Sequence, residues 1–188
     1  MKGSDRTDRS DSHWFLIGYR AVGKTTVAQE LSRRTRRPWI DLDAEIEPQL
    51  EGNISDFFAT HGEAAFRDVE SQTLAKLLDA FDQPTILSLG GGAVLRQENR
   101  HLLKRHGRSI WLSATVATIT ERLAADAKTA GQRPSLTGLD VLDEVQKVLA
   151  VRTPIYRELA DLTVAVDEAT VAEVVDKILA SLIASSSR

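Results

Sequence analysis

Cysteine is absent from the 188 residues of this chain, which excludes disulfides and thiolate metal sites and is compatible with a reducing compartment. No apolar run approaches the roughly 20 residues that a membrane span needs. The four histidines are not spaced like metal ligands, and the formal net charge of −3 gives no sign of nucleic-acid binding. We therefore expect a cytoplasmic protein with neither a membrane nor a nucleic acid as partner.

Length and composition predict one globular domain. The chain is 42% hydrophobic and long enough to bury an ample core. Its opening, MKGSDRTDRSDSH, is polar and contains several aspartates, so it fits neither a secretory signal nor an acid-poor transit peptide. We expect a disordered extension over residues 1–13 and a single domain over residues 14–184.

The first motif is GYRAVGKTT at residues 18–26, directly after the apolar run at residues 14–17. It matches the phosphate-loop pattern G-x-x-x-x-G-K-[ST], and an amphipathic helical pattern follows. Backbone N–H groups and a helix N-terminus attract anions in such a loop. Lys24 is expected to reach the β- and γ-phosphates of a nucleotide, and Thr25 to ligate Mg²⁺. The predicted nucleotide-binding residues of the loop are Gly18, Ala21, Val22, Gly23, Lys24, Thr25 and Thr26.

Strand and helix patterns alternate along the rest of the chain. Strands are predicted at residues 14–17, 38–41, 85–89, 109–112 and 161–166, with helices that include residues 63–80 and 171–182. This alternation predicts an α/β fold in which helices cover both faces of a five-stranded parallel sheet. Ligands of such sheets bind at the carboxyl ends of the strands.

Two aspartates follow the second predicted strand, in WIDLDAEIE. If the strand persists, the carboxylates of Asp41 and Asp43 point to the same side of the sheet, where they could hold Mg²⁺ or a hydroxylated substrate. Alternatively, Asp43 is the N-cap of a helix that begins at Ala44.

Three glycines close the third predicted strand, in SLGGGAV. The bare backbone of Gly90, Gly91 and Gly92 permits close approach to a ligand, and the alternative is a flexible turn.

Three arginines stand out by their context. Arg67 can pair with Glu70 one helical turn later. Arg133 lies in QRPSL, in a segment between two helices that has the composition of a mobile lid over about residues 124–137. Arg152 lies in VRTPIYRELAD. Each alone is typical of a solvated arginine, so their value lies in the joint pattern.

In this order and at these separations, GYRAVGKTT, DLD, ISDFFATHGEAAFRDVE, SLGGGAV, QRPSL and RTPIYRELAD closely resemble the shikimate kinase family, over about residues 14–183. The resemblance implies a three-layer P-loop kinase fold with a mobile lid. It also implies ATP- and Mg²⁺-dependent phosphorylation of the 3-hydroxyl of shikimate, a cyclohexene carboxylate, by a monomer.

The resemblance assigns roles on the nucleotide side. Lys24 would bind the phosphates, while Thr25 and, through water, Asp41 would hold Mg²⁺. Arg133 would close with the lid over both ligands as a catalytic residue, and Arg122 would stack on adenine.

On the acceptor side, the resemblance assigns Asp43 to the ring hydroxyls, where it orients the attacking one and accepts its proton. Arg67 and Arg152 would clamp the carboxylate of shikimate, which a planar guanidinium suits. The backbone of residues 90–92 would line the same pocket, and Glu70 would steady Arg67.

The sequence departs from the family pattern at three places. Ala21 stands where glycine is usual, so that either this position is right-handed or the loop tolerates strain. The lid motif has Ser135 in RPSL, and the segment 122–133 is longer than in compact members.

Two alternatives remain open: another small-molecule kinase of this fold, such as a gluconate or nucleoside monophosphate kinase, and a non-catalytic nucleotide-binding module.

Overall fold

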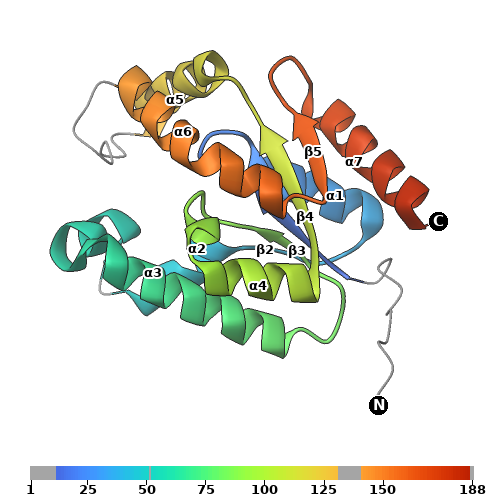
Figure 1. Cartoon of the computed structure of the whole chain (residues 1–188), viewed down its shortest axis with the longest axis horizontal. Coiled ribbons are helices and arrows are strands. Elements are labelled where there is room, and N and C mark those ends of the chain that lie inside the picture. Colours follow the sequence, from blue (N-terminus) through green and yellow to red (C-terminus); the bar gives the residue numbers. More distant parts are fainter. Residues whose placement is uncertain (1–11, 51, 131–140, 187–188) are drawn as a thin grey trace.

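The computed structural model describes residues 12–50, 52–130 and 141–186 (Figure 1). Its strands are β1 (His13–Ile17), β2 (Trp39–Asp41), β3 (Ile86–Ser88), β4 (Gly107–Ser113) and β5 (Leu162–Ala165). Its α-helices are α1 (Lys24–Thr35), α2 (Leu42–Ile46), α3 (Ile54–Ala80), α4 (Gln97–His106), α5 (Val116–Ala130), α6 (Val141–Leu159) and α7 (Val171–Ser186), with short 3-10 helices η2 (Glu47–Gln49) and η3 (Ala93–Leu95). No helix within these ranges is both long and apolar enough to cross a membrane.

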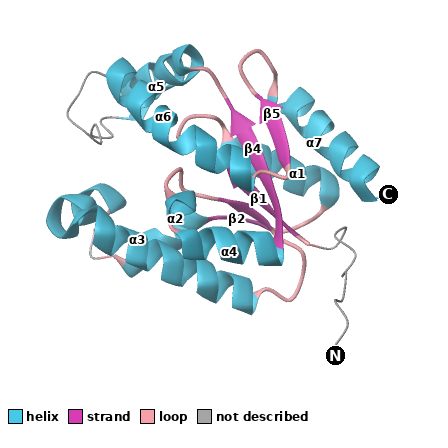
Figure 2. Cartoon of the chain, in the orientation of Figure 1, coloured by secondary structure: helices cyan, strands magenta, loops and turns pink. Residues whose placement is uncertain are grey.

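The five strands form one parallel sheet in the order β2-β3-β1-β4-β5, with helices on both sides (Figure 2). Strand β1 lies at the centre, where Leu16 is in register with Ser88 on one side and Ile110 on the other. The predicted α/β fold is confirmed, and every strand begins and ends within two residues of its predicted bounds.

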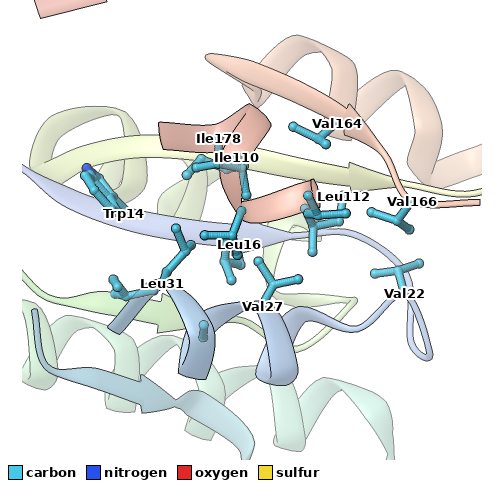
Figure 3. Packing of buried hydrophobic residues seen from close by; sticks show 14 of the residues in the cluster. Trp14, Leu16, Val22, Val27, Leu31, Ile110, Leu112, Val164, Val166 and Ile178 are labelled. Carbon is cyan, nitrogen blue, oxygen red and sulfur yellow. The ribbon is translucent and has the colours of Figure 1, made fainter. Parts of the chain in front are cut away.

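Alternate residues of β1 serve two separate cores. Trp14 and Leu16 pack against α1 and α7 on one face, as Figure 3 shows for part of this cluster. Phe15 and Ile17 pack on the other face with residues of α2, α3 and α4. A strand that is buried on both faces needs a continuous apolar run. This requirement accounts for the apolar residues 14–17 directly before the phosphate loop.

Helix α3 contains a break at Gly62, whose φ of 80° and ψ of 171° are not helical. The predicted helix at residues 63–80 corresponds to the part after this break. The helical stretch before it was not predicted. It begins after Asn53, whose side chain caps the helix by accepting a hydrogen bond from the Asp56 amide.

Candidate functional site

The phosphate loop connects β1 to α1 through a sharply bent backbone. Gly18, Ala21 and Gly23 all have positive φ, at 139°, 62° and 88°. Ala21 is therefore left-handed, so the loop tolerates the strain that its methyl group creates there. Val22 is buried in the core below the loop, whereas Thr26 is exposed on the first turn of α1.

Lys24 folds back over the loop. Its Nζ donates to the carbonyl of Gly18 at 3.1 Å and to that of Tyr19 at 2.8 Å. The ammonium charge thus lies against the loop itself, where the sequence predicts the nucleotide phosphates.

Three oxygen-bearing side chains meet beside the loop. The Thr25 hydroxyl donates to Asp41 Oδ2 at 2.6 Å and lies 3.4 Å from Ser88 Oγ. Asp41 and Ser88 are in register at the ends of β2 and β3. Oxygen ligands suit Mg²⁺, and no cluster of three or more histidine or acidic side chains in the described part of the chain offers a rival metal site.

The structure changes the interpretation of the two aspartates. Strand β2 ends at Asp41. The prediction that Asp41 and Asp43 point to the same side of the sheet required the strand to continue to Asp43, and it does not. The N-cap of α2 is Asp41, whose Oδ1 accepts from the Asp43 amide at 3.1 Å. The suggestion that Asp43 caps a helix beginning at Ala44 is wrong, because that helix begins at Leu42 and Asp43 lies in its first turn.

The three glycines form a turn, residues 90–92, on which side chains from α2, α3 and α6 converge. A Cβ atom on the first glycine would lie 2.9 Å from both Asp43 Oδ1 and Glu70 Oε1. On the second it would lie 3.4 Å from Arg152 Nη1, and on the third it would overlap the Arg67 guanidinium. The bare backbone is needed for these approaches, as the sequence analysis expects.

Arg67 is held by carboxylates on its own helix. Its Nη1 lies 2.7 Å from Glu70 Oε2, and its Nη2 lies 3.2 Å from Glu63 Oε1. The predicted pairing with Glu70 is confirmed. Burial raises the pKa of Glu70, while the positive charge of Arg67 acts in the opposite direction. The pair orients the guanidinium towards the third glycine of the turn.

Arg152 comes from α6 and borders the same turn, so the structure brings the two predicted carboxylate-binding arginines together. The Arg152 guanidinium also lies 6.0 Å from the centre of the Tyr19 ring, in the phosphate loop. A Cβ atom on Gly91 would be 3.3 Å from the Gly18 carbonyl oxygen. The glycine turn therefore abuts the phosphate loop.

Arg122 lies where the phosphate loop meets the end of β5. It donates to the carbonyl of Val166 at 2.8 Å and to that of Ala21 at 3.4 Å. Arg133 lies outside the described residues. The first half of the predicted lid at residues 124–137 is helical, because α5 continues to Ala130.

Sequence reasoning missed three contributions to this site. Ser88 ends its strand directly before the LGGG segment, and that position was a usable signal. Tyr156 follows Arg152 by four residues, a spacing that places both on one face of a helix. The contact between Arg20 and Glu144 joins residues 124 positions apart, so no local pattern could have revealed it.

The arrangement has two adjoining parts. Lys24 and an oxygen cluster lie at the phosphate loop, and two guanidinium groups with the Asp43 carboxylate surround the glycine turn beside it. Such a site can hold nucleotide phosphates next to a second anionic molecule and offers a carboxylate to take up a proton.

Comparisons of the sequence with a family model and with known proteins all point to one family. The model of the shikimate kinase family matches residues 20–183. A shikimate kinase from Rhodopirellula baltica is 39% identical over 168 residues, which cover 89% of this chain and 88% of that protein. A shikimate kinase from Pseudomonas syringae pv. syringae is 39% identical over 167 residues, or 89% of this chain and 94% of that protein.

Comparison with solved structures supports the same family. A shikimate kinase from Acinetobacter baumannii in complex with shikimate has a TM-score of 0.84 and 29% identity, over 94% of this chain and 96% of that one. A gluconokinase from Sinorhizobium meliloti has a TM-score of 0.63 and 18% identity, over 95% of each chain, which indicates a shared fold alone.

Proposed function

Because the chain belongs to the shikimate kinase family, we propose that it transfers the γ-phosphoryl group of ATP to the 3-hydroxyl of shikimate, giving shikimate 3-phosphate and ADP. One observation carries this assignment to the site. The glycine turn, bordered by Arg67 and Arg152, abuts the phosphate loop, so a carboxylate-bearing acceptor would lie beside the nucleotide phosphates. The neighbour that was solved in complex with shikimate supports this choice of acceptor.

On the nucleotide side, the loop from Gly18 to Thr26 holds the phosphates through its backbone N–H groups, and Lys24 moves from the loop carbonyls to the phosphate oxygens. Arg122, which projects from α5 towards the end of β5, would stack on adenine. Arg133 adds positive charge over the transferring group, an expectation that rests on its sequence motif.

The oxygen cluster fits Mg²⁺. The Thr25 hydroxyl would be a direct ligand and Asp41 would act through water, because a small hard cation prefers oxygen ligands and keeps several waters. When bound, Mg²⁺ neutralises charge on the phosphates.

On the acceptor side, Arg67 and Arg152 bind the carboxylate of shikimate by charge-assisted hydrogen bonds. The backbone of residues 90–92 forms the adjoining wall. Asp43 orients the 3-hydroxyl and accepts its proton as that oxygen bonds to the γ-phosphorus. The bond between this phosphorus and the β–γ bridging oxygen breaks, and the electron pair leaves with ADP. One chain supplies both ligand sites, so we propose that the monomer is active.

The direct test is ADP release by the purified chain with ATP and Mg²⁺, with shikimate, gluconate and AMP offered as separate acceptors. We expect turnover with shikimate alone. Turnover with gluconate or AMP would instead support another small-molecule kinase of this fold, and no turnover with any acceptor would support a non-catalytic module.

In the same assay, Lys24→Ala should lower kcat by roughly 100-fold or more, because the variant lacks the ammonium charge that stabilises the transferring phosphoryl group. Lys104→Ala is the control, since Lys104 lies on the surface of α4, 3.5 Å from Glu158. A Lys24→Ala variant with full activity would contradict the assignment of the loop.

A further inference from the structure

Helix α6 carries four residues at a spacing of four: Glu144, Val148, Arg152 and Tyr156. This spacing makes each side chain the neighbour of the next on the helix surface, along a row that turns by about 40° at each step. Glu144 and Tyr156 are fully buried, and Val148 packs against the core that contains Trp14 and Leu16. Arg152 is thus flanked along its helix by two buried polar side chains, each of which contacts a loop of the site.

Tyr156 contacts the glycine turn. Its hydroxyl donates to the Gly91 carbonyl at 2.5 Å, and its ring stacks on Trp111 with 5.9 Å between ring centres. Burial raises the pKa of Tyr156 to about 12, so the hydroxyl keeps its proton and remains a donor at neutral pH. The bond fixes the backbone whose second glycine lies against Arg152.

Glu144 contacts the phosphate loop. Its Oε1 lies 2.5 Å from Nη2 of Arg20, and the exposed fractions of the two side chains are 1% and 22%. A carboxylate this deeply buried is stabilised by a cationic partner. The ion pair therefore ties the first turns of α6 to the loop that holds Lys24.

The two contacts act on the helix at either side of Arg152. Tyr156 is one turn beyond it and Glu144 is about two turns before it. The Arg152 guanidinium lies 3.4 Å from the Cβ position of Gly91 and 6.0 Å from the centre of the Tyr19 ring. Its position is thus defined against the same two loops that Tyr156 and Glu144 contact.

We propose that Tyr156 and Glu144 are positioning residues that set the guanidinium of Arg152 at the junction of the glycine turn and the phosphate loop. The proposal rests on the proposed function, which assigns Arg152 to the acceptor carboxylate. Packing alone does not require these groups, since phenylalanine would fill the space of Tyr156 and a buried ion pair is weak evidence for stability. What they share is that each contacts a loop of the site.

Two conservative variants test the proposal in the full chain. Tyr156→Phe removes one hydroxyl, and Glu144→Gln removes one charge while keeping the side-chain shape. Each should weaken shikimate binding by roughly 3- to 10-fold, the range expected for loss of one hydrogen bond. For Tyr156→Phe, whose contact is with the glycine turn and not with the phosphate loop, binding of ADP with Mg²⁺ should stay within about twofold of wild type. Calorimetric titration measures both affinities.

Matched controls remove similar groups elsewhere. Thr35→Val deletes a hydroxyl that donates to a backbone carbonyl in α1, and Asp176→Asn neutralises the partner of Arg34 on the outer surface. Neither should change shikimate affinity by more than about twofold. Thermal melting of every variant identifies losses that come from unfolding.

The decisive experiment repeats both substitutions in an Arg152→Ala background. Residues that act only through Arg152 should then have no further effect on shikimate affinity, whereas a general structural role would weaken it again. An undiminished effect in that background, or unchanged affinity in both single variants, overturns the positioning proposal alone. Unchanged affinity in Arg152→Ala itself overturns the carboxylate assignment of Arg152, and the positioning proposal with it.

Discussion

Ala21 occupies a backbone conformation that favours glycine. Its φ of 62° places the backbone of Ala21 in the left-handed region, which costs a residue with a Cβ atom roughly 1–2 kcal/mol. Glycine would remove that strain but would add about 0.4–1 kcal/mol of chain entropy to the unfolded state. Ala21→Gly should therefore raise the free energy of unfolding by about 0.5–1 kcal/mol in urea titrations.

The control for this change is Ala124→Gly, in the interior of α5, where glycine should lower stability by roughly 1 kcal/mol. If Ala21→Gly were destabilising to the same extent, the left-handed strain at Ala21 would be absent in solution.

The two arginines at the glycine turn should differ in their effect on stability. Arg67→Ala and Arg152→Ala should each weaken shikimate binding by on the order of 1.5–3 kcal/mol and leave nucleotide binding nearly intact. Arg67→Ala should also lower the melting temperature, because it leaves the buried Glu70 without its cation. Calorimetric titration and thermal melting measure the two effects, with the exposed Arg33→Ala as control. Equal losses for both ligands would contradict the assignment.

At the scale of elements, the glycine turn is the point on which three helices converge. Gly92→Ala should abolish most shikimate binding, because the new methyl group would overlap the Arg67 guanidinium and displace it. Combining Gly92→Ala with Arg67→Ala removes the overlap, so the double variant should bind shikimate no more weakly than Arg67→Ala alone. An additive loss in the double variant would show that the methyl group acts on something other than Arg67.

Strand and loop positions were predictable because their signals are local. An apolar run followed by the phosphate-loop pattern fixes β1, the loop and the start of α1, and these agree with the structure. The end of β2 was not predictable to one residue, because Asp41 can continue a strand or cap a helix and only the observed hydrogen bond decides. Contacts such as Arg20 with Glu144 depend on tertiary packing, which a local pattern does not contain.

At the scale of the whole molecule, the amino-terminal ends of the central strands, which lie opposite the site, carry a pH-sensitive contact. His13 Nδ1 accepts a hydrogen bond from the Thr85 amide at 3.1 Å. Burial lowers the pKa of His13 below its usual 6.5, and the positive charges of His106 and Arg37 act in the same direction. The unfolded chain therefore binds this proton more readily than the folded one.

Stability should fall with acidification for this reason. The contribution of His13 is fully present above the unfolded pKa of about 6.5 and is lost as the pH falls through that value towards the lower folded pKa. Urea titrations between about pH 7 and pH 5 should show a shallower decline for His13→Asn than for wild type. The exposed His101→Asn is the control, and an unchanged slope in His13→Asn would exclude His13 as the source.

The central place of β1 also affects how the chain forms during synthesis. The strand is made first, yet its neighbours β3 and β4 end at residues 88 and 113. At typical translation rates, roughly 5–20 s separate the appearance of Ile17 from that of Ser113. For roughly the first 4–14 s of that interval, until Ser88 appears, both edges of β1 lack their partners, and afterwards the edge that pairs with β4 still waits. The nascent chain is therefore most exposed to aggregation, and most dependent on chaperones, before the second half of the sheet emerges.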